Sequence, residues 1–228
     1  MKKIVFVALM AIVFAACSQS TKNDLTICNV GGVEIILPKP GKAFKSIDAS
    51  KLSNDFNYIK LGNNILCVFI DSSEFIKSND KSYNINELIT YAFIMIDKDK
   101  EKTDCTSEYF KKYIDDIVND NNRLILDIFK KENPDSNDIK NFIANSKGEG
   151  VFPICNLFNT NNSYGMLSLN MGREGNEYSS SIIVLNAFRI RNRMLVVMIF
   201  KKYESYNTIK WLTNTSEAWA KAILDANK

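Results

Sequence analysis

The sequence predicts an α+β fold: a mainly antiparallel sheet of hairpins, flanked by helices in an α/β/α sandwich, with a C-terminal helix packed on the sheet. Three observations predict it. Short apolar runs separated by turn signals dominate both ends of the chain, which is typical of antiparallel strands. Residues 107–129 instead repeat apolar side chains every three or four positions, as an amphipathic helix does. The last 20 residues return to this helical pattern.

The first strands are expected in pairs. Residues 25–37 place two apolar runs around Gly31-Gly32, which indicates a hairpin. The stretch PKPGK then ends the second run, because proline cannot donate to a strand ladder. Residues 56–61 and 65–71 flank a Gly-Asn-Asn turn and predict a second hairpin, and residues 88–96 predict a buried strand.

Helices in the middle of the chain separate these strands from a second group. Pro134 stops the helix expected over 107–129, and a shorter helix is expected over 136–148. Four strands then follow, and the last two are joined by a tight hairpin around Arg191-Asn192. Their expected ranges are 151–159, 164–171, 180–190 and 193–203.

The final strand contains the run MLVVMIF, which is apolar on both faces, so both faces must be covered. The covers would be helices, or helices on one side and a smaller sheet on the other. A C-terminal helix supplies one cover through an apolar stripe, which is Ile209, Leu212, Trp219, Ala222 and Ile223. Asn214 and Glu217 resemble a capping box, which predicts a short turn before the main helix.

The chain opens on an export signal. Two lysines precede an apolar run over residues 4–14, and two alanines then precede Cys17. The run is too short to cross a bilayer as a helix, which takes about 20 apolar residues. The placement of Cys17 after FAA resembles the lipobox of bacterial lipoproteins, although Phe14 stands where leucine is usual. An ordinary secretory signal and a membrane-spanning anchor are the alternatives.

No internal repeat and no interior linker appears after residue 24, so residues 25–228 are expected to form a single globular domain. The lipobox resemblance implies that residues 1–16 are the signal peptide and residues 17–24 a flexible tether. It also implies acylation of Cys17, cleavage before it, and membrane attachment through the acyl chains. Ser18, in place of aspartate, resembles the lipoproteins that a diderm bacterium sorts to its outer membrane.

Composition excludes several classes of protein. The chain has no histidine, which removes Ser–His and Cys–His nucleophile pairs and imidazole metal ligands. Lysine and arginine (29) nearly balance aspartate and glutamate (26), so no nucleic-acid partner is expected. Neither a phosphate-binding P-loop nor a glycine-flanked serine elbow occurs. No cofactor, metal or catalytic residue is therefore expected.

Four cysteines follow Cys17, namely Cys28, Cys67, Cys105 and Cys155. An exported chain would allow them to pair in any of three ways, but the sequence has no CxxC, and two of the four lie in apolar runs typical of buried free thiols. The question of disulfides stays open. One cysteine, Cys105, precedes a helix whose N-terminus would lower its pKa; the alternative is a structural cysteine.

Other candidate sites each have a simpler interpretation. The acidic stretch 97–108 resembles an EF-hand calcium loop, but Lys102 occupies the glycine position, and the alternative is a solvated turn. Trp211 and Trp219 suggest a ligand platform, although Trp219 favours the core. The polar loops 159–165 and 172–180 would carry binding or serve as plain turns.

The order of elements resembles the PsbP-like fold, known from extrinsic photosystem II proteins and bacterial relatives. The stretches VEIILPKPGKAF and WLTNTSEAWAKAILDAN carry this resemblance, which covers residues 33–226. It implies an antiparallel sheet between helices and a binding or assembly-accessory role without catalysis. No functional residue carries over, because no family motif matches.

We therefore expect a lipid-anchored cell-envelope protein that acts as a non-catalytic binding or assembly-accessory module for another envelope protein. One alternative is an envelope hydrolase that uses two carboxylates about 5–10 Å apart. The other is a purely structural envelope lipoprotein.

Overall fold

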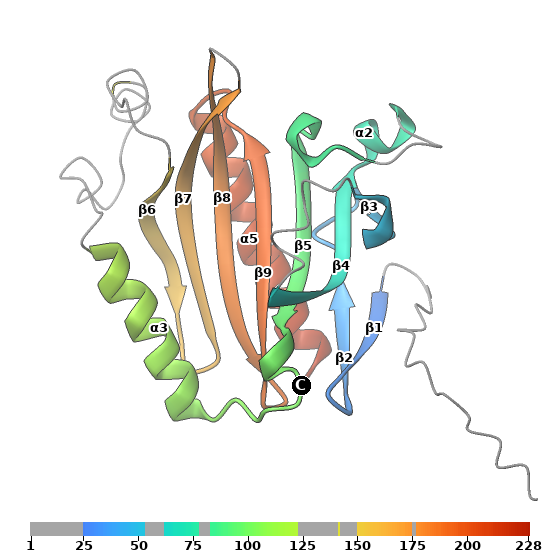
Figure 1. The fold of residues 1–228 in the computed structure, drawn as a ribbon, viewed down its shortest axis with the longest axis vertical. Coiled ribbons are helices and arrows are strands. Elements are labelled where there is room, and N and C mark those ends of the chain that lie inside the picture. Colours follow the sequence, from blue (N-terminus) through green and yellow to red (C-terminus); the bar gives the residue numbers. More distant parts are fainter. Residues whose placement is uncertain (1–24, 53–61, 78–82, 123–140, 142–149, 175–176) are drawn as a thin grey trace, which may run out of the picture.

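The fold is built on a seven-stranded antiparallel sheet. The computed structural model describes residues 25–52, 62–77, 83–122, 141, 150–174 and 177–228 (Figure 1). The sheet has the strand order β3-β4-β5-β9-β8-β7-β6, and every neighbouring pair is antiparallel. Its strands are β3 (Phe44–Ile47), β4 (Asn63–Asp71), β5 (Thr90–Asp97), β6 (Gly150–Asn159), β7 (Ser163–Glu174), β8 (Glu177–Ile190) and β9 (Arg193–Lys202).

A separate two-stranded sheet confirms the first predicted hairpin. β1 (Leu25–Val30) pairs with β2 (Val33–Pro38) around Gly31-Gly32. Both glycines have positive φ, at 55° and 85°, which side chains rarely tolerate. A Cβ on Gly31 would also lie 2.1 Å from the carbonyl oxygen of Glu101, so this turn needs glycine for two reasons.

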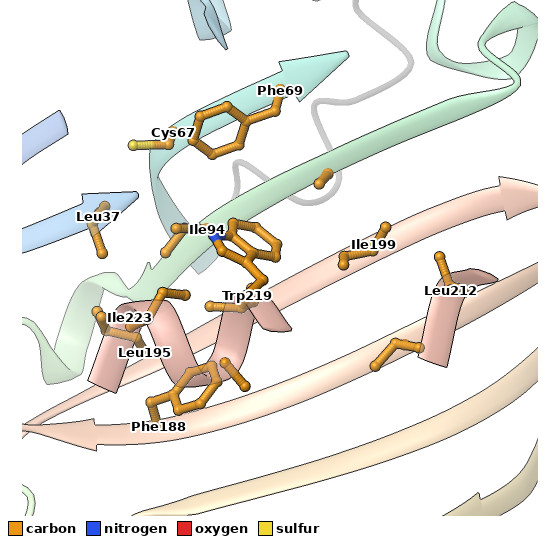
Figure 2. Close-up of a cluster of buried hydrophobic side chains, with 14 of the residues drawn as sticks. Leu37, Cys67, Phe69, Ile94, Phe188, Leu195, Ile199, Leu212, Trp219 and Ile223 are labelled. Carbon is orange, nitrogen blue, oxygen red and sulfur yellow. The ribbon is translucent and has the colours of Figure 1, made fainter. Parts of the chain in front are cut away.

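The C-terminal helix α5 (Tyr206–Ala226) packs on the large sheet, as predicted. Its buried stripe includes Ile209, Leu212, Trp219 and Ile223, of which Figure 2 labels the last three, while Ala222 is only half-buried. The short turn predicted before the main helix is wrong. The helix instead runs unbroken through Asn214, because the apolar stripe continues on both sides of it, and it begins at the N-cap Ser205.

Helices lie on both faces of the sheet. α3 (Ser107–Asn122) packs through Phe110 and Ile114 on Tyr164, Met166 and Met194. Because successive strand residues face opposite sides, this is the face away from α5, which Leu195, Val197 and Ile199 line. The small sheet shares the α5 face, since Cys28, Val30, Ile35 and Leu37 join the same core cluster.

The cover of β9 differs from the prediction. Its α5 face is fully buried, but Val196, Met198 and Phe200 on the other face are half-buried. Short elements cover part of that second face near β4 and β5: α2 (Ser72–Lys77), and the 3-10 turns η1 (Ala49–Lys51) and η3 (Ile85–Glu87). The smaller sheet therefore lies beside the C-terminal helix and not opposite to it.

The second predicted hairpin falls partly outside the described residues. Residues 56–61 are not described, and β4 pairs with β3 on one side and with β5 on the other. Residues 123–129 of the predicted central helix also lie outside the described residues, as does all of 136–148 except residue 141. The predicted hairpin between β8 and β9 is confirmed, with positive φ at Arg191 and Asn192.

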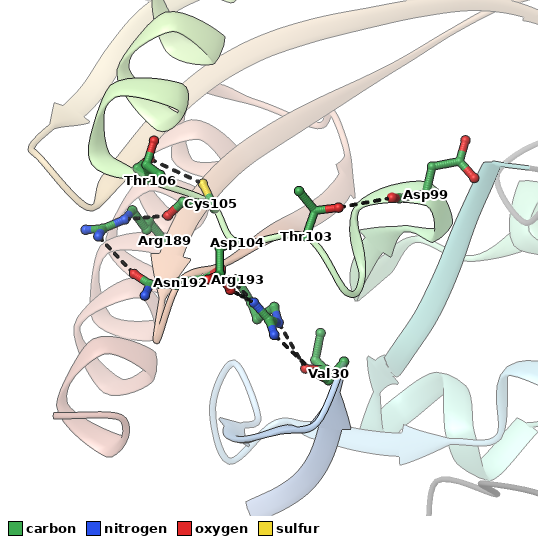
Figure 3. Close-up of polar contacts among 10 residues, drawn as sticks. Val30, Asp99, Thr103, Asp104, Cys105, Thr106, Arg189, Asn192 and Arg193 are labelled. Carbon is green, nitrogen blue, oxygen red and sulfur yellow. Dashed lines mark hydrogen bonds and ion pairs between the residues drawn. The ribbon is translucent and has the colours of Figure 1, made fainter.

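Arginines at the β8–β9 turn join three segments at one corner (Figure 3). Arg193 is buried, and its guanidinium donates to the carbonyl oxygens of Val30 (3.2 Å) and Gly31 (3.0 Å) and to the carboxylate of Asp104 (2.5 Å). Arg189 donates to the carbonyl oxygen of Cys105 at 2.8 Å. This corner therefore holds the small sheet and the start of α3 against the large sheet.

Candidate functional site

A groove of about 420 Å³ lies between the edge strand β6 and the first half of α5. Its lining combines an apolar floor with a polar rim. The apolar and aromatic members are Ile154, Leu157, Leu167, Tyr206 and Ile209, and the polar members are Cys155, Asn156, Lys210, Thr213 and Asn214. Its volume is that of a small-molecule or side-chain binding cleft, while its lining is divided about evenly between apolar and polar residues.

The irregular path of β6 shapes one wall of the groove. The pairing of β6 with β7 shifts register after Pro153 and again after Asn156. Proline and bulges are typical of edge strands, since they discourage pairing with another chain. They also break strict alternation, so the consecutive residues Ile154 and Cys155 both border the groove.

Two buried contacts hold the groove walls in place. A Cβ on Gly165 would lie 2.6 Å from the ring of Phe158. Because Gly165 has no side chain, the Phe158 ring on β6 can pack directly against the backbone of β7 at this position. Asn186 on β8 donates to the hydroxyl of Ser216 on α5 at 2.9 Å, and both side chains are fully buried. These two polar groups satisfy each other only when α5 lies in one position along β8, so the pair fixes the alignment of the helix on the sheet. It therefore also fixes the width of the groove.

The polar rim carries positive charge. Lys210 is the one charged side chain among the described lining residues, and its Nζ lies 5.3 Å from the ring centre of Tyr206. The side chain of Asn156 faces away from the groove, because Asn156 lies opposite Met166 on the α3 face and its Oδ1 accepts from the hydroxyl of Tyr164 at 2.7 Å. Burial raises the pKa of Tyr164 to about 12, so this donor keeps its proton at neutral pH. The groove thus favours an apolar partner with a negative group.

The four described cysteines are all free thiols, so the structure contains no disulfide among them. Cys28, Cys67 and Cys105 are buried, while Cys155 is half-buried in the groove wall. Burial raises the pKa of both Cys105 and Cys155, and Arg189 only partly opposes this at Cys105. The lowered pKa considered for Cys105 is therefore wrong, and the structural interpretation holds.

The two tryptophans differ. Trp219 belongs to the core, as predicted: it is 1% exposed, meets Phe69 edge-on at 5.8 Å, and donates from Nε1 to the carbonyl oxygen of Pro38 at 2.6 Å. Trp211 is half-buried and stacks on Phe44 at 6.3 Å, with the Lys201 ammonium 5.2 Å from its ring centre. Neither tryptophan lines the groove.

The predicted polar loops are mostly turns and strand ends. In loop 159–165, Thr160 and Ser163 bond to each other, and Asn162 accepts from Arg189 at 2.8 Å. Residues 172–174 and 177–180 belong to β7 and β8, so the predicted loop 172–180 is largely a strand pair. Both stretches favour the turn interpretation over a binding loop.

The acidic stretch 97–108 forms a capped turn. The Asp97 carboxylate accepts from the backbone N–H of Asp99 at 2.8 Å, at the start of the 3-10 turn η4 (Lys98–Lys100). Across the part of the chain that the structure describes, no three histidine, cysteine, aspartate or glutamate side chains gather as metal ligands would. This geometry favours the solvated turn over a calcium loop.

The groove was missed by sequence reasoning. Its polar residues come from β6 and α5, which are about 50 positions apart in the chain, and no short motif joins them. The sequence around Asn214 predicts a helix cap, and the apolar run around Cys155 predicts a buried thiol. The irregular composition of β6, with Pro153 inside an apolar run, was the one local signal that this strand lies at an edge.

No family model, curated protein or solved structure matches this chain. Among the described residues, no helix combines the length and the apolar character needed to cross a membrane. The predicted acylation site, Cys17, lies outside the described residues.

Proposed function

We propose that this chain is a lipid-anchored cell-envelope protein that serves as a non-catalytic binding or assembly-accessory module, with the β6–α5 groove as its binding site. The groove is the observation that carries this proposal. Acyl chains on Cys17 attach the protein to a membrane, which is the outer membrane if the host is diderm. A PsbP-like relationship would suit the same role, and it is part of this proposal.

The chemistry of the groove indicates its ligand. The floor supplies apolar and aromatic surface, while Lys210 supplies a cation at the rim. An apolar segment of an envelope protein that carries a carboxylate would match both. Its side chains would displace water from the floor, and its carboxylate would pair with the ammonium of Lys210.

The hydrolase alternative needs two carboxylates facing one cleft. No carboxylate occurs among the groove residues that the structure describes. The structural alternative needs no ligand at all, so a saturable ligand that occupies the groove separates it from our proposal.

A fluorescent apolar anion, 1-anilinonaphthalene-8-sulfonate, tests the groove directly. Every strand pairing and core contact described above lies within residues 25–228, so the chain from residue 18 onward retains the fold. We expect this chain to bind the probe saturably. Thr213→Trp, which fills the groove, is expected to weaken binding at least tenfold, and Lys210→Glu at least threefold.

Lys111→Glu is the matched control, because Lys111 is exposed on α3, across the sheet from the groove. Circular dichroism checks that each variant is folded. Probe binding that is unchanged by Thr213→Trp would refute the groove as the site. Hydrolysis of an envelope polysaccharide, abolished by one carboxylate substitution, would favour the enzyme alternative instead.

A further inference from the structure

We propose that the outward face of the β1–β2 hairpin docks on the membrane surface beside the lipid anchor and orients the domain there; this rests on the proposed acylation of Cys17. The docking face consists of Leu25, Ile27, Ile36 and Pro38. Its partner is the interface of a bilayer that contains anionic headgroups.

Strand β1 presents large apolar side chains to solvent. Leu25 is 41% exposed and Ile27 is 37% exposed, although Thr26 and Cys28 between and beside them are buried. The strict alternation shows that β1 has one face in the core and one face outside. The outward face of a solvated strand normally carries polar residues, and Leu25 and Ile27 give this one a small exposed apolar face instead.

The strand register makes the apolar residues contiguous. Leu25 lies opposite Pro38 and Ile27 lies opposite Ile36, and directly opposed residues share one face of a sheet. Ile36 and Pro38 are half-buried, and each extends the apolar surface onto β2. Further along the same face, toward the glycine turn, Asn29 is opposite the exposed Glu34. The face is therefore apolar at one end and polar at the other.

The apolar end is the end to which the lipid anchor attaches. Residues 17–24 separate the acylated cysteine from Leu25, and eight residues span at most about 28 Å even when fully extended. Acyl chains in the bilayer thus keep Leu25 within this distance of the headgroups. The short tether raises the local concentration of membrane at the docking face, so a small apolar face is enough to bind.

Positive charge flanks the same end. Lys39 follows Pro38 directly, and the exposed Lys42 lies three positions further along the chain. Lysines beside an apolar face are attracted by anionic headgroups while the apolar side chains enter the interface. In Figure 1, β6 is the edge strand farthest from the β1–β2 hairpin, and it lines the groove, so docking through the hairpin would leave the groove open to a partner.

Lipid-specific quenching tests this proposal on the mature, processed chain. Ile27→Cys is labelled with the fluorophore NBD in a chain that also carries Cys155→Ser, because the other described cysteines are buried. The matched control is Val151→Cys in the same background, since Val151 is 49% exposed on β6. Both proteins are reconstituted in phosphatidylethanolamine–phosphatidylglycerol vesicles that contain nitroxide-labelled lipid. We expect quenching at position 27 to be at least threefold greater than at position 151.

Intact mass of the same samples separates the two proposals. If the protein is acylated and quenching is equal at positions 27 and 151, the docking proposal is refuted but the proposed lipid anchor is not. Protein without acyl chains would overturn the anchor and docking together. A blue shift at position 27 without quenching by nitroxide lipid would identify a second copy of the chain as the occupant, and it would also overturn docking. Adding Leu25→Asn to the Ile27→Cys protein should at least halve the quenching.

Discussion

Replacing Trp219 by alanine should destabilise the protein more than any other single truncation in α5. The indole joins three parts of the fold: the helix that carries it, Phe69 on β4 (Figure 2), and the carbonyl oxygen of Pro38 on β2. Aromatic-to-alanine changes in a packed core cost about 3–5 kcal/mol. The partly buried carbonyl oxygen of Pro38, which loses its donor, adds about 1 kcal/mol. We expect a loss of about 4 kcal/mol or more, which lowers Tm by about 8–16 °C in a chain of this size.

Urea denaturation of the chain from residue 18 onward, followed by far-UV circular dichroism, measures this loss. The m-value should stay unchanged, since the substitution alters stability and not the surface exposed on unfolding. Trp219→Phe keeps most of the apolar volume and should cost about 1–2 kcal/mol. Trp211→Ala is the control, because Trp211 is half-buried on the same helix. A loss below about 1 kcal/mol for Trp219→Ala, or one no larger than for Trp211→Ala, would refute the packing described here.

Four further outcomes are expected. Gly31→Ala should lower the free energy of unfolding in urea by more than about 2 kcal/mol, because its Cβ would meet a backbone oxygen at 2.1 Å. Gly32→Ala should lower it by only about 1 kcal/mol, because the space around Gly32 is open. Thiol titration of the unfolded chain from residue 18 onward, without reductant, should find four free thiols. In the folded chain only Cys155 should react, and it should react slowly because burial raises its pKa. The pKa of Tyr164 is raised from 10.0 to about 12 in the folded state. Its contribution to stability is therefore complete below pH 10 and is lost as the pH rises toward 12. In denaturation curves taken across this pH range, Tyr164→Phe should reduce that loss of stability. Cys17→Ala should abolish palmitate labelling and release the protein from the membrane fraction, and continued membrane association would contradict the anchor.

Elements that local chemistry determines were predictable from the sequence. Glycine at 31 and 32 and the Arg191-Asn192 pair supply the backbone angles of tight hairpins, and both hairpins are confirmed. The pairing of β4 was not predictable in the same way. An apolar strand of this length pairs equally well with several partners, and its actual neighbours, β3 and β5, are chosen by the packing of the whole sheet.

Positions that depend on tertiary contacts were also missed. The pattern at Asn214 and Glu217 is a local cap signal, but the buried positions Leu212 and Ser216 keep the helix continuous there. The groove is a product of the same tertiary contacts, because it exists only where the bulged β6 meets α5. Local patterns therefore predicted the scaffold of the site but not the site.

α5 connects the two proposed interaction regions. Its first half lines the groove, and at its C-terminal end Asn227 bonds to both backbone groups of Ile36, at 2.9 and 2.7 Å. A helix of 21 residues is about 31 Å long. Because the helix is packed on the sheet along its length, docking of the hairpin on a membrane would hold the groove in a fixed orientation to that membrane. The groove and the docking face share no residue, so a partner in the groove and a membrane at the hairpin would not compete for the same side chains.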